Sequence, residues 1–114
     1  MYERALKLAR SLGRPLIVVG APDRGPTRGP GYGDITVDLG WSNAPNFVQA
    51  DICKPLPFPD DYAVVYVSCV LEYIPNHCVD FARAELLRIA GDRSRFFDVK
   101  VEPWTAAIAI SGNP

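Results

Sequence analysis

A six-residue run near the middle of the chain, Tyr62–Val67 (YAVVYV), constrains the fold more than any other segment. It is rich in β-branched and aromatic residues, and no charged residue marks a solvent-facing side. A strand that is apolar on both faces is typical of the centre of a parallel sheet that is covered on both sides. Pro55, Pro57 and Pro59 precede the run, and proline neither donates to a sheet nor continues a helix. The sequence therefore predicts an α/β fold in which an ordered loop enters a central strand.

Length and charge narrow the class of protein. The 114 residues suit a single domain spanning 1–114. A net charge of -1 indicates neither a nucleic-acid partner nor attraction to an anionic membrane. Because no apolar run is long enough to span a bilayer and no signal peptide is evident, we expect a cytoplasmic protein.

The cysteine pattern favours free thiols. Cys53, Cys69 and Cys78 are odd in number and have no CxxC spacing. This spacing indicates neither a disulfide framework nor a zinc site, so we predict buried, reduced cysteines.

Apolar periodicity predicts two helices and further strands around the central one. A helix over residues 2–12 is expected to end at Gly13, and a second helix is expected to begin at Asn76 as N-cap and to end at Gly91. On the second helix, Glu85 and Arg88 are expected to lie on the solvent-facing side. Short β-rich segments predict strands at 16–19, 35–39, 47–50 and 95–101, with 105–110 as a further strand or a packed tail.

The connection between the first two of these strands is unusual. Residues 21–34 contain three prolines and four glycines, so no crossover helix of useful length fits there. Arg24 and Arg28 in this segment leave open a nucleotide-binding domain that contacts phosphate, although no helix N-terminus supports it.

Three motifs carry a family resemblance: Asp51-Ile52, Leu56-Pro57-Phe58-Pro59-Asp60, and Val70-Leu71-Glu72-Tyr73-Ile74-Pro75. Together they resemble class I S-adenosylmethionine-dependent methyltransferases of the small-molecule type, over residues 16–103. The resemblance implies a Rossmann-like open sheet, mostly parallel, of five to six strands with helices on both faces. In this chain the first crossover helix and the C-terminal hairpin are expected to be missing.

The same resemblance assigns the nucleoside end of a cofactor site. It places Gly20 against the cofactor, Asp38 with Leu39 at the ribose, and Asp51 with Ile52 at the adenine ring. A carboxylate suits a ribose because its two oxygens accept from both hydroxyls. Two alternatives remain open: Asp38 caps the turn that follows it, and Asp51 caps its own loop.

The methionine end of S-adenosylmethionine is assigned to the turn after the central strand. The resemblance places Ser68, Cys69 and Leu71 there. No catalytic residue is identified, because methyl transfer needs mainly alignment of donor and acceptor. For His77, capping or solvent exposure is expected in preference to a general-base role.

Two functions follow as hypotheses. The first is an S-adenosylmethionine-dependent methyltransferase acting on an unidentified acceptor. The alternative is a non-catalytic, methyltransferase-like binding or scaffold protein. It is favoured by the loop after Gly20, where Pro22 and Asp23 break the glycine spacing of the family, and by Ala63, where the family has an aspartate. A fifth strand with an open edge further predicts a homodimer or a partner subunit at the C-terminal edge of the sheet.

Overall fold

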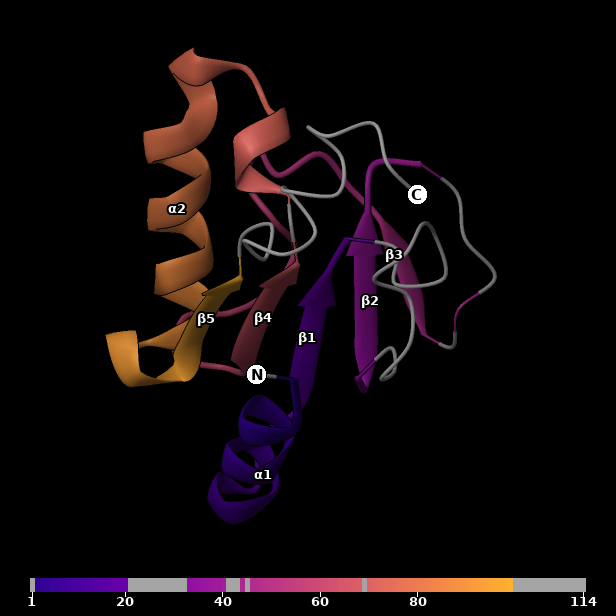
Figure 1. The fold of residues 1–114 in the computed structure, drawn as a ribbon, viewed down its shortest axis with the longest axis vertical. Coiled ribbons are helices and arrows are strands. Elements are labelled where there is room, and N and C mark those ends of the chain that lie inside the picture. The colour runs from indigo at the N-terminus through magenta and orange to yellow at the C-terminus, as the bar shows by residue number, and fades with distance from the viewer. Residues whose placement is uncertain (1, 21–32, 41–43, 45, 69, 100–114) are drawn as a thin grey trace, which may run out of the picture.

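Five short parallel strands form one open sheet with two helices packed against it (Figure 1). The computed structural model describes residues 2–20, 33–40, 44, 46–68 and 70–99. The elements are α1 (Tyr2–Leu12), β1 (Leu16–Val19), β2 (Ile35–Asp38), β3 (Phe47–Gln49), β4 (Val64–Ser68), the 3-10 turn η1 (Leu71–Tyr73), α2 (Asn76–Ala90), the 3-10 turn η2 (Arg93–Arg95) and β5 (Phe96–Val99). The predicted α/β fold with a parallel sheet is confirmed.

The strand order is β3-β2-β1-β4-β5, and every pairing is parallel. β1 is central: Ile17 is aligned with Ile35 of β2 on one side and with Val65 of β4 on the other. The chain therefore builds outward from β1 in one direction and then returns to build in the other. All five carboxyl ends lie at one edge of the sheet, as parallel pairing requires.

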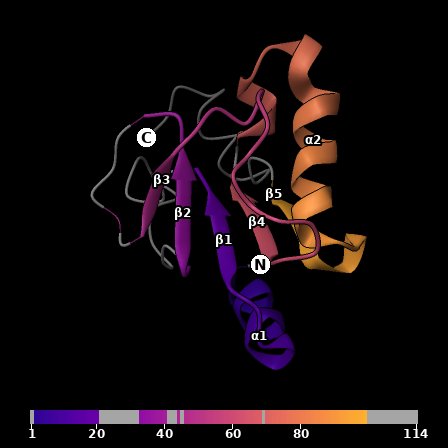
Figure 2. The same ribbon diagram turned by 180° about the vertical axis from the view of Figure 1, so that it is seen from behind.

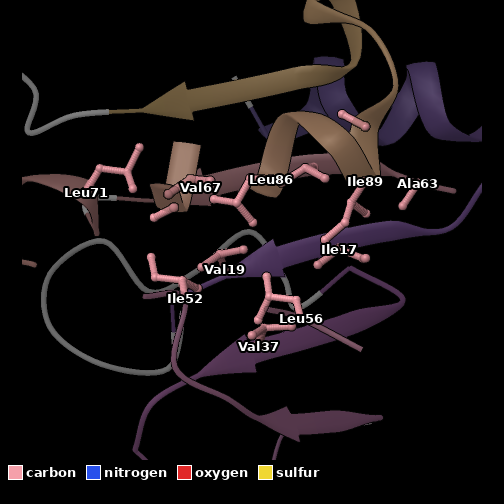
Figure 3. Packing of buried hydrophobic residues seen from close by; sticks show 13 residues of the cluster. Ile17, Val19, Val37, Ile52, Leu56, Ala63, Val67, Leu71, Leu86 and Ile89 are labelled. Atoms are coloured by element: carbon pink, nitrogen blue, oxygen red, sulfur yellow. The ribbon is translucent and has the colours of Figure 1, made fainter. Parts of the chain in front are cut away.

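The two faces of the sheet bury separate cores. On the α2 face, Ile17, Val19, Val65 and Val67 pack with Leu86, one of the buried residues of α2 (Figure 3). The intervening residues of β1 and β4 belong to a second cluster, which α1 covers; its members are Tyr2, Ala5, Ala9, Leu16, Val18, Val64 and Tyr66. The central strands are thus covered on both sides, which explains why they carry no charged residue.

The segment between β3 and β4 follows α2 along its length. Figure 2 shows it leaving the carboxyl edge of the sheet and running beside α2 to the start of β4. Its contacts come in sequence: Cys53 with Cys78, Leu56 with Glu85, and Asp61 with the carbonyl of Arg88. The proline-rich segment is therefore an ordered loop, as predicted.

Strand boundaries differ from the predictions mainly at β4. β1 has the expected bounds, while β4 begins at Val64 rather than Tyr62. Asp61 has a positive φ of 52°, and the amides of Tyr62 and Ala63 donate to the carbonyl of Ile89 instead of to a neighbouring strand. β5 ends the strand order in the described part of the chain, at Val99. The proposed strand at 105–110 and residues 21–32 of the first crossover lie outside the described residues.

Two predictions about α2 are wrong. Pro75, not Asn76, occupies the N-cap position, and no side chain caps that end of the helix. Glu85 is buried rather than solvent-facing, because the loop between β3 and β4 lies over it and the amide of Leu56 donates to its carboxylate. The end of the helix is as predicted: Gly91 adopts the left-handed conformation, with φ of 79°, and its amide donates to Leu87.

Candidate functional site

The carboxyl edge of the sheet near β1 is the place where the fold favours ligand binding. In open α/β sheets, ligands bind outside the carboxyl ends of strands at the point where the strand order reverses. Here that point lies between β1 and β4. Gly20 follows β1, Asp38 ends β2, and Asp51 lies two residues after the end of β3. Topology therefore brings these three predicted site residues to the same edge.

Gly20 continues the β1 backbone in a conformation that suits glycine. It is buried, its φ is 103°, and its amide donates to the carbonyl of Val37 at 2.8 Å. A side chain is strongly disfavoured at this φ, so glycine is favoured here and no side chain projects from the backbone at this strand end.

Asp38 is tied to the turn that follows it. Its carboxylate accepts from the amide of Gly40 at 3.1 Å, which is the capping interaction that the sequence left open. Its carbonyl accepts from Ala50 at 3.0 Å, so the ends of β2 and β3 are joined by backbone hydrogen bonding. Leu39 exposes 67% of its surface, and its carbonyl accepts from the side-chain amide of Gln49 at 3.0 Å.

Asp51 makes a tight turn of its own. Its Oδ1 accepts from the amide of Cys53 at 2.9 Å, and its carbonyl accepts from Lys54 at 3.0 Å. Ile52 is buried in the core on the α2 face, so its side chain anchors the turn. The capping alternative for Asp51 is therefore also observed. A carboxylate has about four acceptor positions, so one such bond leaves capacity for a ligand.

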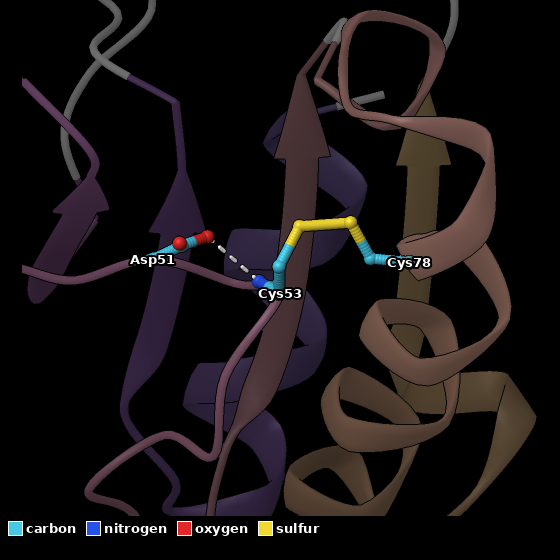
Figure 4. The surroundings of a disulfide bond; sticks show 3 residues. All are labelled: Asp51, Cys53 and Cys78. Carbon is cyan, nitrogen blue, oxygen red and sulfur yellow. Dashed lines mark hydrogen bonds between the residues drawn. A yellow bond between two sulfur atoms is a disulfide. The ribbon is translucent and has the colours of Figure 1, made fainter.

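A disulfide joins Cys53 to Cys78, which overturns the prediction of reduced thiols (Figure 4). The two Cα atoms are 5.4 Å apart, within the range that a disulfide spans. Spacing in sequence could not reveal the pair, because 25 residues separate the two positions and the fold alone brings them together. The bond connects the turn of Asp51 to the first turn of α2.

The predicted methionine end is only partly described. Ser68 ends β4, and Cys69 lies outside the described residues. Leu71 belongs to η1 and is only 4% exposed. Its side chain packs in the core on the α2 face and so anchors η1 to that core. His77 is exposed in the first turn of α2, as expected.

Sequence reasoning missed a polar network behind the site. The buried carboxylate of Glu85 accepts from the amide of Leu56 at 2.6 Å and from Arg88 at 2.8 Å. Hydrogen bonding from Arg88 holds the pKa of Glu85 below its usual range, while burial acts in the opposite direction. The sequence does show a glutamate and an arginine three residues apart on one helix, which is the spacing of an ion pair. It does not show that both side chains bind backbone groups of the loop between β3 and β4.

The described residues also bear on metal sites, membrane-spanning helices and hollows of the surface. Among the described residues, no group of three or more side chains is arranged to hold a metal ion. No helix in the described part of the chain is long and apolar enough to cross a membrane. A hollow of about 370 Å³ lies between α2 and β5, lined by Arg83, Leu87, Arg93, Phe96 and Asp98. It lies beside the β5 end of the sheet, whereas Asp38 is the last residue of β2 and Asp51 lies just beyond β3.

Comparison with known proteins adds no relative: no family model, curated protein or solved structure matches the chain. The functional argument therefore depends on the geometry of the carboxyl edge.

Proposed function

We propose that this domain binds S-adenosylmethionine at the carboxyl edge of the sheet and transfers its methyl group to an acceptor molecule. The order β3-β2-β1-β4-β5 in an all-parallel sheet supports a Rossmann-like arrangement, in which nucleoside cofactors bind across the point of reversal. The observation that carries the proposal is the placement of two carboxylates, Asp38 and Asp51, at the ends of adjacent strands beside Gly20.

The donor groups present suit a nucleoside. In the proposal, Asp38 accepts from the ribose hydroxyls and Asp51 accepts from the adenine amino group. Gly20, with no side chain, allows the cofactor to approach the β1 backbone. Ser68, at the end of β4, and Leu71, at the start of η1, are assigned to the methionine portion.

The chemistry makes small demands on the protein. Bound S-adenosylmethionine supplies a methyl group already activated by its sulfonium. The protein aligns the acceptor in line with that methyl group and excludes water, and orientation of this kind supplies much of the rate enhancement. This accounts for a site built from binding groups, with His77 exposed rather than positioned as a base.

The alternative is a binding protein of the same fold without catalysis. It is favoured by the fact that Asp38 and Asp51 both accept hydrogen bonds from their own loops. Such carboxylates would hold a rigid pocket that senses the cofactor.

Calorimetry with S-adenosylmethionine and S-adenosylhomocysteine tests the proposal. Because hydrogen bonds to charged groups contribute about 1.5–3 kcal/mol, Asp38→Asn is expected to weaken binding by about ten- to a hundredfold. Asparagine retains an acceptor for the Gly40 amide, so the turn is preserved. Asp80→Asn, at an exposed position of α2, is the matched control and should bind as the wild type does. If neither ligand produced heat, the methyltransferase and the cofactor-sensing form of the alternative would both be refuted.

Methyl transfer separates the two functions. Incubation with methyl-labelled S-adenosylmethionine and a small-molecule extract should yield a labelled product if the domain is an enzyme. Tight binding without any labelled product would favour the binding protein. The proposed homodimer or partner subunit at the C-terminal edge is tested by sedimentation, where a monomer at high micromolar concentration would count against the homodimer.

A further inference from the structure

We propose that the Cys53–Cys78 disulfide is a redox-responsive clip that holds the Asp51 turn and thereby sets the ligand affinity of the carboxyl edge. The part that concerns affinity rests on the proposed function; the part that concerns the turn does not. The disulfide is the only covalent link between the described loop 51–63 and α2.

At one end, the clip acts directly on Asp51. The amide of Cys53 donates to Asp51 Oδ1, so the cysteine and the carboxylate belong to a single turn (Figure 4). Displacing the Cys53 amide from this position would therefore remove a hydrogen bond that orients the carboxylate.

At the other end, the clip secures a weak helix terminus. Pro75 occupies the N-cap of α2, no side chain caps that end, and the first turn contains no acidic residue. Such a terminus frays readily, since the first amides of a helix have no partner four residues earlier; the amide of Cys78 donates instead to the carbonyl of Pro75 at 3.0 Å. Cys78 lies next to His77 in this first turn and is only 6% exposed. Its disulfide to Cys53 ties the turn to the loop.

The remainder of the loop is held independently of the disulfide. The backbone amide of Leu56 donates to the carboxylate of Glu85, and that of Asp61 donates to the carbonyl of Arg88. The side chain of Arg88 donates to the carbonyl of Phe58. Ile52 and Leu56 are both 6% exposed, so their burial limits any released stretch to residues 53–55. Opening the disulfide is therefore a local event that leaves the sheet and most of α2 in place.

The switching reaction is thiol–disulfide exchange with a small thiol of the glutathione class. A thiolate attacks the sulfur of Cys53, the more exposed of the two cysteines, and Cys78 leaves as a thiolate that takes up a proton. A second thiol then attacks the mixed disulfide, which releases Cys53 as a thiol and the reagent as its disulfide. Two thiols are oxidised and one cystine is reduced to two cysteines.

The first measurement needs no ligand. Alkylation under denaturing conditions should add one group to the oxidised chain and three to the reduced chain, since the sequence contains three cysteines. Amide hydrogen exchange of Cys53, Lys54 and Cys78, whose amides are hydrogen-bonded at the two ends of the clip, should accelerate by about tenfold or more on reduction, while β1 and β4 keep their protection. Cys53→Ser/Cys78→Ser should exchange like the reduced chain and should not respond to the thiol. Three alkylations of the oxidised chain, or equal exchange in both states, would overturn the clip.

The second measurement uses S-adenosylhomocysteine as the probe. Its dissociation constant should rise by about five- to tenfold on reduction and in the double serine variant, which is typical of coupled sites. By reciprocity, saturating ligand should shift the thiol–disulfide equilibrium toward the oxidised chain by the same factor. Equal affinity in both redox states would overturn control of the site. Faster exchange on reduction with no binding in either state would support the clip and refute the proposed function.

Discussion

Arg88 donates to both carboxylate oxygens of Glu85, at 2.8 Å each, and the two side chains together hold the proline-rich loop against α2. Glu85 accepts from the amide of Leu56, and Arg88 donates to the carbonyl of Phe58 at 2.8 Å and to Asp60 at 2.7 Å. A buried carboxylate is tolerated only when it is paired and hydrogen-bonded, and here each condition is met. This pair fixes the approach of the chain to β4.

Replacing Glu85 by glutamine should destabilise the protein. The variant keeps an acceptor for Leu56 but loses the charge that binds Arg88, so we expect a loss of about 1.5–3 kcal/mol in the free energy of unfolding. Chemical denaturation measures it. Asp80→Asn, on the exposed side of the same helix, should change the free energy by less than about 0.5 kcal/mol. Equal effects of the two substitutions would mean that the pair does not hold the loop.

Stability should decline in acid because several carboxylates are held ionised in the folded state. Hydrogen bonding from Arg88 lowers the pKa of Glu85, and hydrogen bonding from Arg10 lowers the pKa of Asp34. A lowered folded-state pKa gives stability that is fully present above the unfolded-state value, about pH 4, and is lost as the pH falls through the folded-state value. We expect a constant denaturation midpoint from about pH 6 to 8 and a fall below about pH 4.

The variant Glu85→Gln provides the control for the acid dependence. Because one titrating group has been removed, its stability should fall less between neutral and acid pH than that of the wild type. An identical decline in both proteins would show that Glu85 contributes nothing to the acid dependence.

Removing the disulfide should lower stability without changing the fold. Closing a loop of 25 residues stabilises a protein by about 3 kcal/mol in the chain-entropy view. Cys53→Ser/Cys78→Ser should therefore unfold at a lower denaturant concentration, while its far-ultraviolet circular dichroism stays that of the wild type. Equal midpoints for the variant and the oxidised wild type would contradict this expectation.

The sequence predicted correctly those features that depend on residues close to one another along the chain. β1 was predicted to the residue because four apolar residues are bounded by Pro15 and Gly20, and the end of α2 was predicted because Gly91 supplies a left-handed cap. The start of β4 was misplaced because the amides of Tyr62 and Ala63 bind a carbonyl of α2, which no local pattern reveals.

The same distinction between local and long-range contacts applies to the candidate site. The ends of β1, β2 and β3 could be read from the sequence, so the positions of Gly20, Asp38 and Asp51 at the strand ends were predicted, as were the capping alternatives for the two aspartates. The disulfide and the buried state of Glu85 could not, since each depends on the path of the loop beside α2. A glutamate on the polar side of a helix is ordinarily exposed; here the amide of Leu56 and the guanidinium of Arg88 together make its burial favourable.

Gly13 and Gly91 have similar backbone conformations but different surroundings. Comparing alanine substitutions at the two positions therefore separates the cost of backbone strain from the cost of a steric clash. Gly13 and Gly91 have φ of 66° and 79°, so alanine is strained at both. At Gly13 an added Cβ meets nothing within 4 Å, whereas at Gly91 it lies 2.6 Å from Asp61 Cγ and 2.9 Å from Asp61 Cβ. Asp61 in turn accepts from Arg14 at 2.6 Å and from Arg95 at 2.9 Å, so displacing it disturbs both contacts.

We therefore expect Gly13→Ala to cost about 1–2 kcal/mol and Gly91→Ala to cost at least about 1 kcal/mol more, measured by chemical denaturation. Replacing Asp61 by glycine removes the colliding atoms and relieves the positive φ at that position. In the Asp61→Gly background, the cost of Gly91→Ala should therefore fall to that of Gly13→Ala. If Gly91→Ala costs the same with and without the Asp61 side chain, the contact between Asp61 and Gly91 does not position the loop at the end of α2.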